Sequence, residues 1–193
     1  MSTTTLRNSV AAGTLAVSLV VLPGCSSSSK SSSSSTNAVG AAVNVSPSPT
    51  TSAERVKLAK TKFVLNASLG AGAAYQWLYK PFKAGTFKKG AKGRTAALIK
   101  GGLAGAFTYN RLSAALTDAK GDPTLSKATT ALSSAVAGIK GLPGKIKNGS
   151  ATDADFNQVQ TTVNGFKSAG SSNGLNVTDQ VPSTGQLTKM VSN

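Results

Sequence analysis

Residues 52–80 read SAERVKLAKTKFVLNASLGAGAAYQWLYK, and this stretch decides the fold class. Apolar or small residues recur every three or four positions, at Val56, Ala59, Phe63, Ala67, Gly70, Ala74 and Trp77. That spacing is typical of an amphipathic α-helix. Ser52 is the expected N-cap, and Pro81 is expected to end the helix at or before Lys80.

Helical periodicity continues through the rest of residues 53–193. It predicts helices over about 95–120, from Pro123 (with Asp122 as N-cap) to about Ile139, and from Thr152 or Asp153 to about Gly170. Basic linkers over 82–93 and 145–149 separate them. Residues 170–193 are expected to be a loop-like tail with one short helix, 183–191. The chain is therefore predicted to be all-α, an antiparallel bundle of about four helices.

The amino-acid composition excludes several kinds of catalytic and metal-binding site. The 193 residues include no histidine and one cysteine, and 21 Lys and Arg against 6 Asp and Glu give a net charge of +15. Without histidine, Ser-His-Asp and Cys-His catalysis, the usual zinc sites and histidine-ligated haem are excluded. Most of the acids fall at expected helix ends, where capping explains them. We predict no catalytic residue, no metal site and no cofactor; an enzyme using a Ser–Lys or Asp pair is the least favoured hypothesis.

The first residues have the pattern of an export signal. Arg7 precedes an uncharged apolar run of 13 residues, Val10 to Leu22. A membrane span needs about 20 residues, so this run has the length of a signal-peptide core instead. The run leads into Leu22-Pro23-Gly24-Cys25, which contains the single cysteine of the chain.

This ending resembles the lipobox of bacterial lipoproteins, in which an aliphatic residue lies three positions before the cysteine and a small residue directly before it. Pro23 departs from the Ala, Ser or Thr that is usual at its position. The resemblance implies that residues 1–24 are a signal peptide, that cleavage falls between Gly24 and Cys25, and that the Cys25 thiol carries a diacylglycerol. The protein is then expected on the extracytoplasmic face of the cell membrane, anchored by its lipid.

The residues after the cysteine have the composition of a tether. Residues 26–52 are rich in Ser, Pro and Thr and are expected to be a disordered linker before a helical domain, 53–193. The runs Lys62-Phe-Val-Leu-Asn-Ala67 and Tyr79-Lys-Pro-Phe-Lys-Ala-Gly-x-Phe87 resemble small secreted or lipid-anchored proteins of high-GC actinobacteria. That resemblance implies the same location and a helical domain, and it carries no catalytic residue.

A basic surface is the first feature that suggests a function. Residues 53–193 hold 19 Lys and Arg against 6 Asp and Glu, a net charge of +13, and such a field attracts polyanions. We expect contact with anionic lipid, an envelope polymer or an acidic protein, with no specific nucleic-acid partner; the alternative is an ordinary solvated face. The residues expected to make this contact are Lys80, Lys83, Lys88, Lys89, Lys92 and Arg94.

Aromatic and small residues suggest two further sites. Tyr75, Trp77 and Tyr79 alternate beside lysines, which suits an interface or a stacked ligand, although a core seam would explain them as well. Small residues at 67–74 and 101–106 predict close packing between the first two helices, with a re-entrant hairpin as the alternative. The favoured function is a non-enzymatic, membrane-anchored binding or structural role; the alternative is a small-ligand module with a Gly-lined cleft near Trp77.

Overall fold

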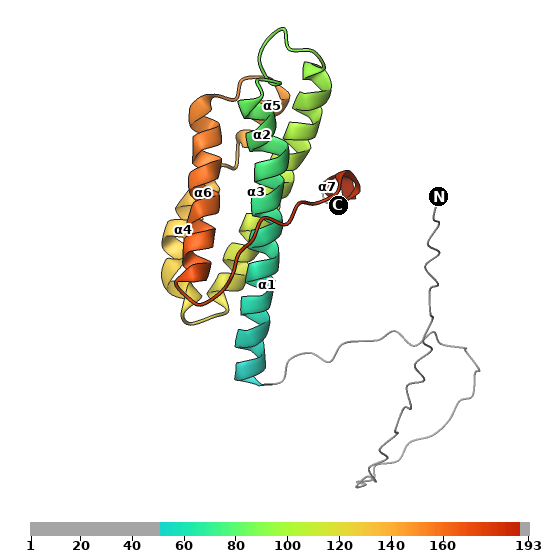
Figure 1. The fold of residues 1–193 in the computed structure, drawn as a ribbon. Helices are drawn as coiled ribbons and strands as arrows, with labels where there is room; N and C mark the ends of the chain where they lie inside the picture. Colours follow the sequence, from blue (N-terminus) through green and yellow to red (C-terminus); the bar gives the residue numbers. More distant parts are fainter. Residues whose placement is uncertain (1–50, 190–193) are drawn as a thin grey trace, which may run out of the picture. The chain divides into compact units, whose positions relative to one another are not determined.

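The computed structural model describes residues 51–189, all of which belong to one compact unit. The predicted signal peptide, the lipid site at Gly24 and Cys25 and most of the tether lie outside the described residues. Within them the chain forms helices and no strand, so the all-α prediction is confirmed. Successive long helices α1 (Ser52–Ala73), α3 (Arg94–Lys120), α4 (Thr129–Gly138) and α6 (Asp153–Ser171) alternate in direction, as in an antiparallel bundle (Figure 1).

The first helix begins with a capping box. The Thr51 hydroxyl accepts a hydrogen bond from the Glu54 backbone N–H, and the Glu54 carboxylate accepts one from the Thr51 N–H. The prediction of Ser52 as N-cap is wrong by one residue, because Thr51 places a glutamate at the third helical position, where the box needs it.

The first helix also continues past Pro81. A π-helical segment, η1 (Ala74–Tyr79), joins α1 to the short α2 (Lys80–Lys83), and the Lys80 N–H donates to the Tyr75 carbonyl, five residues back. The prediction that Pro81 ends the helix is therefore wrong. A wider turn can accommodate a proline, which lacks the N–H of the ordinary α-helical bond. Residues 52–83 thus form one rod about 45 Å long.

The turn after α3 is built on Asp122. As predicted, its buried carboxylate caps the following residues, accepting bonds from the N–H groups of Thr124 and Leu125. Pro123, however, lies in the turn and not in the helix. The chain first forms a 3₁₀ turn, η2 (Leu125–Ala128), and then α4.

A short helix, α5 (Leu142–Lys147), replaces the basic loop that was predicted over 145–149. Proline is well suited to the first turn of a helix, and Pro143 lies in the first turn of α5. Ile146 is fully buried against α3, where a Cβ added at Gly101 would lie 3.0 Å from it. Gly102 and Gly105 therefore make room for α5, and Gly101 makes room for Ile146 of α5 and for the Phe87 ring. The predicted close packing of α1 on α3 occurs instead further along, where Gly70 faces Leu112.

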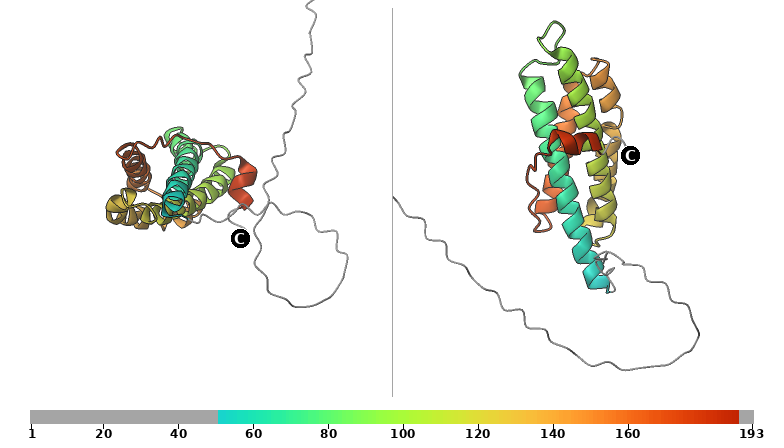
Figure 2. Two further views of the ribbon diagram at one scale, coloured as in Figure 1. Left: turned by 90° about the horizontal axis from the view of Figure 1, so that it is seen from below. Right: turned by 90° about the vertical axis from the view of Figure 1, so that its right-hand side faces the viewer.

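The expected tail is a packed strap. Residues 172–183, here called the strap, run back across α1 to α7 (Thr184–Lys189), which lies against α3 on the outside of the bundle (Figure 2). Ser68 holds the strap through two bonds: its hydroxyl accepts from the Thr178 N–H and its carbonyl from the Gln180 N–H. The strap passes so close to α1 that a Cβ at Gly72 would overlap the Gln180 carbonyl group. Val177 and Leu187 are buried.

Aromatic stacks fix α6 against the first rod. Phe63 of α1 stacks on Phe166 with ring centres 6.0 Å apart, and Phe82 and Phe87 both stack on Phe156, at 4.2 and 5.6 Å. None of the helices over 51–189 combines the length and the apolar character that crossing a membrane requires.

Candidate functional site

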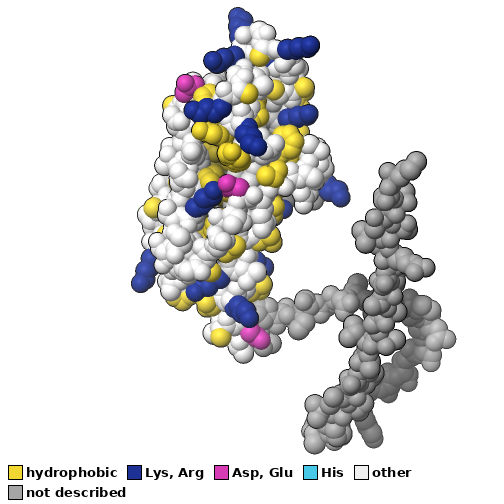
Figure 3. All heavy atoms as spheres, in the orientation of Figure 1, with side chains coloured by type: hydrophobic (Ala, Val, Ile, Leu, Met, Phe, Trp, Pro, Cys, Tyr) yellow, Lys and Arg dark blue, Asp and Glu magenta, His cyan; other side chains and the backbone are white. Residues whose placement is uncertain are grey.

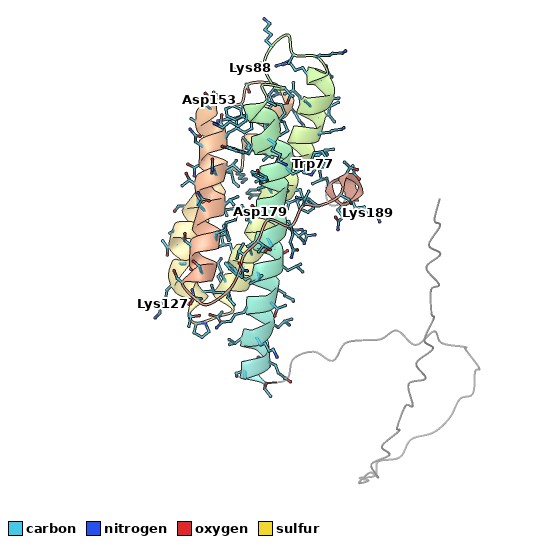
Figure 4. The ribbon with its side chains drawn as sticks, in the orientation of Figure 1. Trp77, Lys88, Lys127, Asp153, Asp179 and Lys189 are labelled. Carbon is cyan, nitrogen blue, oxygen red and sulfur yellow. The ribbon has the colours of Figure 1, made fainter. Side chains whose placement is uncertain are left out.

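The six basic residues predicted to contact an anionic surface gather at one end of the bundle. Lys88, Lys89 and Lys92 are exposed in the loop 84–93, with Lys88 at its tip (Figure 4). Lys80 and Lys83 are exposed on the last turns of the first rod, and Arg94, half-buried, begins α3. We call these six residues the basic pole.

The fold fixes this loop at both of its ends. The stacking of Phe82 and Phe87 on Phe156 attaches its start to α6. The Arg94 Nε donates a hydrogen bond of 3.0 Å to the Phe87 carbonyl, and Gly93 turns into α3 with φ 74°. A positive φ favours glycine at this point. Arg94 therefore supports the loop, and the lysines of the pole are the residues that it presents to solvent.

Two carboxylates, Asp155 and Asp153, lie at the same end, and Asp155 is engaged in hydrogen bonds. Asp155 accepts from Lys145 Nζ at 2.7 Å and from the Thr152 N–H, and these bonds hold its pKa below the ordinary value. Asp153 lies at the start of α6, at the edge of the same end (Figure 4). Figure 3 shows Lys and Arg side chains spread around this end of the molecule. Lys147 of α5 adds to its positive charge, whereas the charge of Lys145 is paired with Asp155.

The other described carboxylates serve the structure elsewhere. Asp118 accepts from the Asn66 amide at 2.8 Å, Asp122 lies 3.6 Å from Lys60, and Asp179 pairs with Lys167 at 2.7 Å. Each of these acids already has a partner in the described part of the chain, and Asp179, which shares a pocket with Tyr75 and Tyr79, is held by Lys167.

The predicted aromatic residues divide between two sides of the first rod. Tyr75 and Tyr79 stack with ring centres 6.1 Å apart, Lys80 Nζ lies 5.1 Å from the Tyr75 ring centre and Lys83 Nζ 5.5 Å from that of Tyr79. Residues five apart point about 140° away from each other on an α-helix. The π-helical turn brings Tyr75 and Lys80 to one face, so it creates this cation–π pair.

Trp77 lies on another side, toward α7 (Figure 4). It is half-buried, and its Nε1 donates to the Pro182 carbonyl of the strap at 3.3 Å. An open groove of about 460 Å³ runs beside it between Lys80 and Lys100, with Gly93 as its one glycine. The predicted Gly-lined cleft is thus wrong in its lining, because α5 covers the Gly101–Gly105 stripe.

One further pocket lies between η1 and α6, lined on one side by Tyr75 and Tyr79 and on the other by Gln160 and Asn164. Sequence reasoning named the tyrosines but missed the amides, since polar residues on the outer face of a helix carry no signal by themselves.

Over residues 51–189, no three His, Cys, Asp or Glu side chains lie close enough to hold a metal ion. No protein-family model, curated protein or solved structure matches this chain.

Proposed function

We propose that this protein is a non-enzymatic, lipid-anchored domain that binds a polyanionic polymer of the cell envelope through its basic pole. The observation that carries the proposal is the concentration of exposed lysines on one fixed loop and the helix end beside it, Lys80, Lys83, Lys88, Lys89 and Lys92. A clustered positive field attracts a polyanion because binding releases the counterions of the polymer.

The position of the pole favours a polymer over the anchoring membrane. The chain enters the bundle at Thr51, and the pole lies at the opposite end of the first rod, about 45 Å away (Figure 1). A flexible linker of the length between Cys25 and Thr51 has a mean reach of roughly 25–30 Å. A tether at Thr51 would attach the rod at the end farthest from the pole, so the pole is free to turn toward the envelope while the anchor stays in the lipid surface.

Two triple variants with the same change in charge test this proposal. K88Q/K89Q/K92Q removes three charges from the pole, and R55Q/K57Q/K62Q removes three exposed charges from the other end of the first rod. Lys60 is left in place because it pairs with Asp122. The chain from Ser26 onward contains every described residue and serves as the parent.

Long-chain inorganic polyphosphate is the probe, with binding measured across a series of salt concentrations. We expect the parent and R55Q/K57Q/K62Q to bind alike. The pole variant should bind at least about ten times more weakly, with a salt slope reduced by about 2, which corresponds to three lost phosphate contacts. Equal weakening of the two variants would mean that total charge, and not the pole, attracts the polymer.

Vesicles distinguish the lipid alternative. The same three proteins are sedimented with vesicles that contain one-third anionic phosphatidylglycerol and with purely zwitterionic vesicles. Binding to the anionic vesicles that depends on the pole lysines, together with weak binding to polyphosphate, would favour the membrane surface and contradict the polymer proposal.

A further inference from the structure

The pocket between η1 and α6 has an apolar floor. Its inner wall consists of Ala74 and Leu78 from the first rod and of Val159 and Val163 from α6, all buried. The pocket measures about 100 Å³ and is partly open to solvent. A dry cavity of about 150 Å³ admits a benzene ring, so this one has room for a small apolar group such as a methyl or acetyl, and not for an acyl chain.

The rim carries polar side chains that have no hydrogen-bond partner within residues 51–189. Gln160 and Asn164 are four residues apart and therefore lie side by side on the exposed edge of α6. Neither side-chain amide makes a hydrogen bond within residues 51–189, and neither do the hydroxyls of Tyr75 and Tyr79. An amide side chain offers both donors and an acceptor, so the pair can satisfy both the N–H and the carbonyl of another amide.

The charge of the rim is balanced. Lys167 lines the pocket, but its amine is 2.7 Å from the Asp179 carboxylate of the strap. A bound carboxylate or phosphate would have to compete with Asp179 for Lys167. The pocket itself therefore suits a neutral group, whereas the lysines of the pole lie close by for charged parts of a longer ligand.

An aromatic face completes the site. Tyr75 is 45% exposed and lines the pocket beside the two amides. Exposed tyrosine rings pack against the C–H faces of sugar rings, because such faces are apolar while the sugar's edge hydroxyls stay in water. Tyr79 already stacks on the Tyr75 ring, and the Lys80 ammonium lies 5.1 Å from its centre, so a sugar ring has to share Tyr75 with these two side chains. A sugar placed there with a substituent pointing into the pocket would use all of these groups at once.

We infer that this pocket binds the acetamido group of an N-acetylated amino sugar. The methyl group enters the floor between Leu78 and Val163, the amide pairs with Gln160 and Asn164, and the sugar ring packs on Tyr75. This site rests on the proposed function, because it would hold one sugar unit of the same envelope polymer whose charges the pole attracts.

Two trisaccharides that differ in the acetamido group test the inference. Triacetylchitotriose carries this group on each ring, and cellotriose has the same linkage with a hydroxyl in its place. Each is titrated into the isotope-labelled chain from Ser26 onward, and the NMR signals are followed. We expect the side-chain amide signals of Gln160 and Asn164 to move with triacetylchitotriose, and cellotriose to bind at least ten times more weakly.

A matched pair of variants locates the binding. Q160A/N164A removes the two rim amides, and N157A/T161A makes two exposed changes, also four residues apart, on the same helix outside the pocket. Q160A/N164A should lose at least ten-fold in affinity for triacetylchitotriose while N157A/T161A keeps the parent value. Equal affinity for both sugars, or unchanged affinity of Q160A/N164A, would overturn the inference.

The test is independent of the polyanion experiment. Q160A/N164A changes no charge, so it should still bind polyphosphate as the parent does. Binding of polyphosphate without any specific binding of triacetylchitotriose would overturn the sugar site alone. Binding of triacetylchitotriose without pole-dependent binding of polyphosphate would contradict the proposed function and leave a neutral sugar as the ligand.

Discussion

The close crossing of the strap over α1 at Gly72 gives a sharp prediction, that Gly72→Ala destabilises the protein. In the middle of a helix this change ordinarily stabilises, by about 1 kcal/mol, because alanine has the higher helix propensity. Here the added Cβ would overlap the Gln180 carbonyl group and lie 2.7 Å from the Val181 nitrogen. Both neighbours are backbone atoms, so the strap itself has to move away.

The cost follows from what the strap loses. Moving it breaks the two hydrogen bonds to Ser68, each worth about 1 kcal/mol, and exposes Val177, whose burial is worth roughly 2 kcal/mol. After the gain in helix propensity, we expect the free energy of unfolding to fall by about 3 kcal/mol. Gly165→Ala is the matched control: its Cβ meets only a Leu132 methyl at 3.6 Å, so it should stabilise by up to about 1 kcal/mol.

Urea unfolding followed by helical circular dichroism measures both free energies, and hydrogen exchange locates the change. In Gly72→Ala the amides of Thr178 and Gln180, which donate to Ser68, should lose protection while those of α3 keep it. If Gly72→Ala were as stable as the parent and the Gln180 amide stayed protected, the strap would not lie on α1 as described.

The remaining predictions concern α6 and the pH dependence. Phe156→Ala should cost about 3–5 kcal/mol and speed hydrogen exchange in the loop 84–93, because two rings stack on Phe156; unchanged exchange there would show that the loop is held otherwise. Thr152→Ala should lower the free energy of unfolding, measured in urea, by about 1 kcal/mol, because Thr152 caps α6. Thr161→Ala, inside the same helix, is the control, and an equal loss in the two variants would argue against the cap. Burial raises the pKa of Asp122, but hydrogen bonds from Thr124 and Leu125 and the charge of Lys60 lower it more. The hydrogen bond from Lys145 lowers the pKa of Asp155. The two ionised carboxylates stabilise the fold fully above the ordinary pKa of 3.8, and this stabilisation is lost as the pH falls through their lowered pKa values. In acid unfolding, the free energy of unfolding of D122N/D155N should therefore fall less steeply with pH than that of the parent.

Helices with a clear three-and-four spacing could be predicted from the sequence, and their interruptions could not. The apolar stripes predicted the spans of α3 and α6 correctly, and Thr152 was recognisable as the N-cap of α6. Pro81 favours a helix end by its local chemistry, whereas the structure continues past it through a π-helical turn, with Phe82 stacked on Phe156 directly afterwards. Pro143 could not be assigned from the sequence, because a proline can follow the end of one helix or lie in the first turn of the next.

Periodicity also leaves open which element covers a given face. The glycines at 101–105 predicted that another helix packs closely on α3, but their spacing could not show whether that helix is α1 or α5. The grouping of Lys80 to Lys92 was visible in the sequence, because these residues are neighbours along the chain. The amides Gln160 and Asn164 became a candidate site only when the fold placed η1 beside them.

The proposed function requires that the pole, and not the total positive charge, binds a polyanion. The most direct measurement is an NMR titration of the labelled chain from Ser26 onward with inorganic polyphosphate at physiological salt. The proposal predicts that backbone signals shift over residues 80–94 and stay in place over residues 52–62, which carry Arg55, Lys57, Lys60 and Lys62. Shifts of similar size at both ends of the first rod, or shifts confined to residues 52–62, would contradict it.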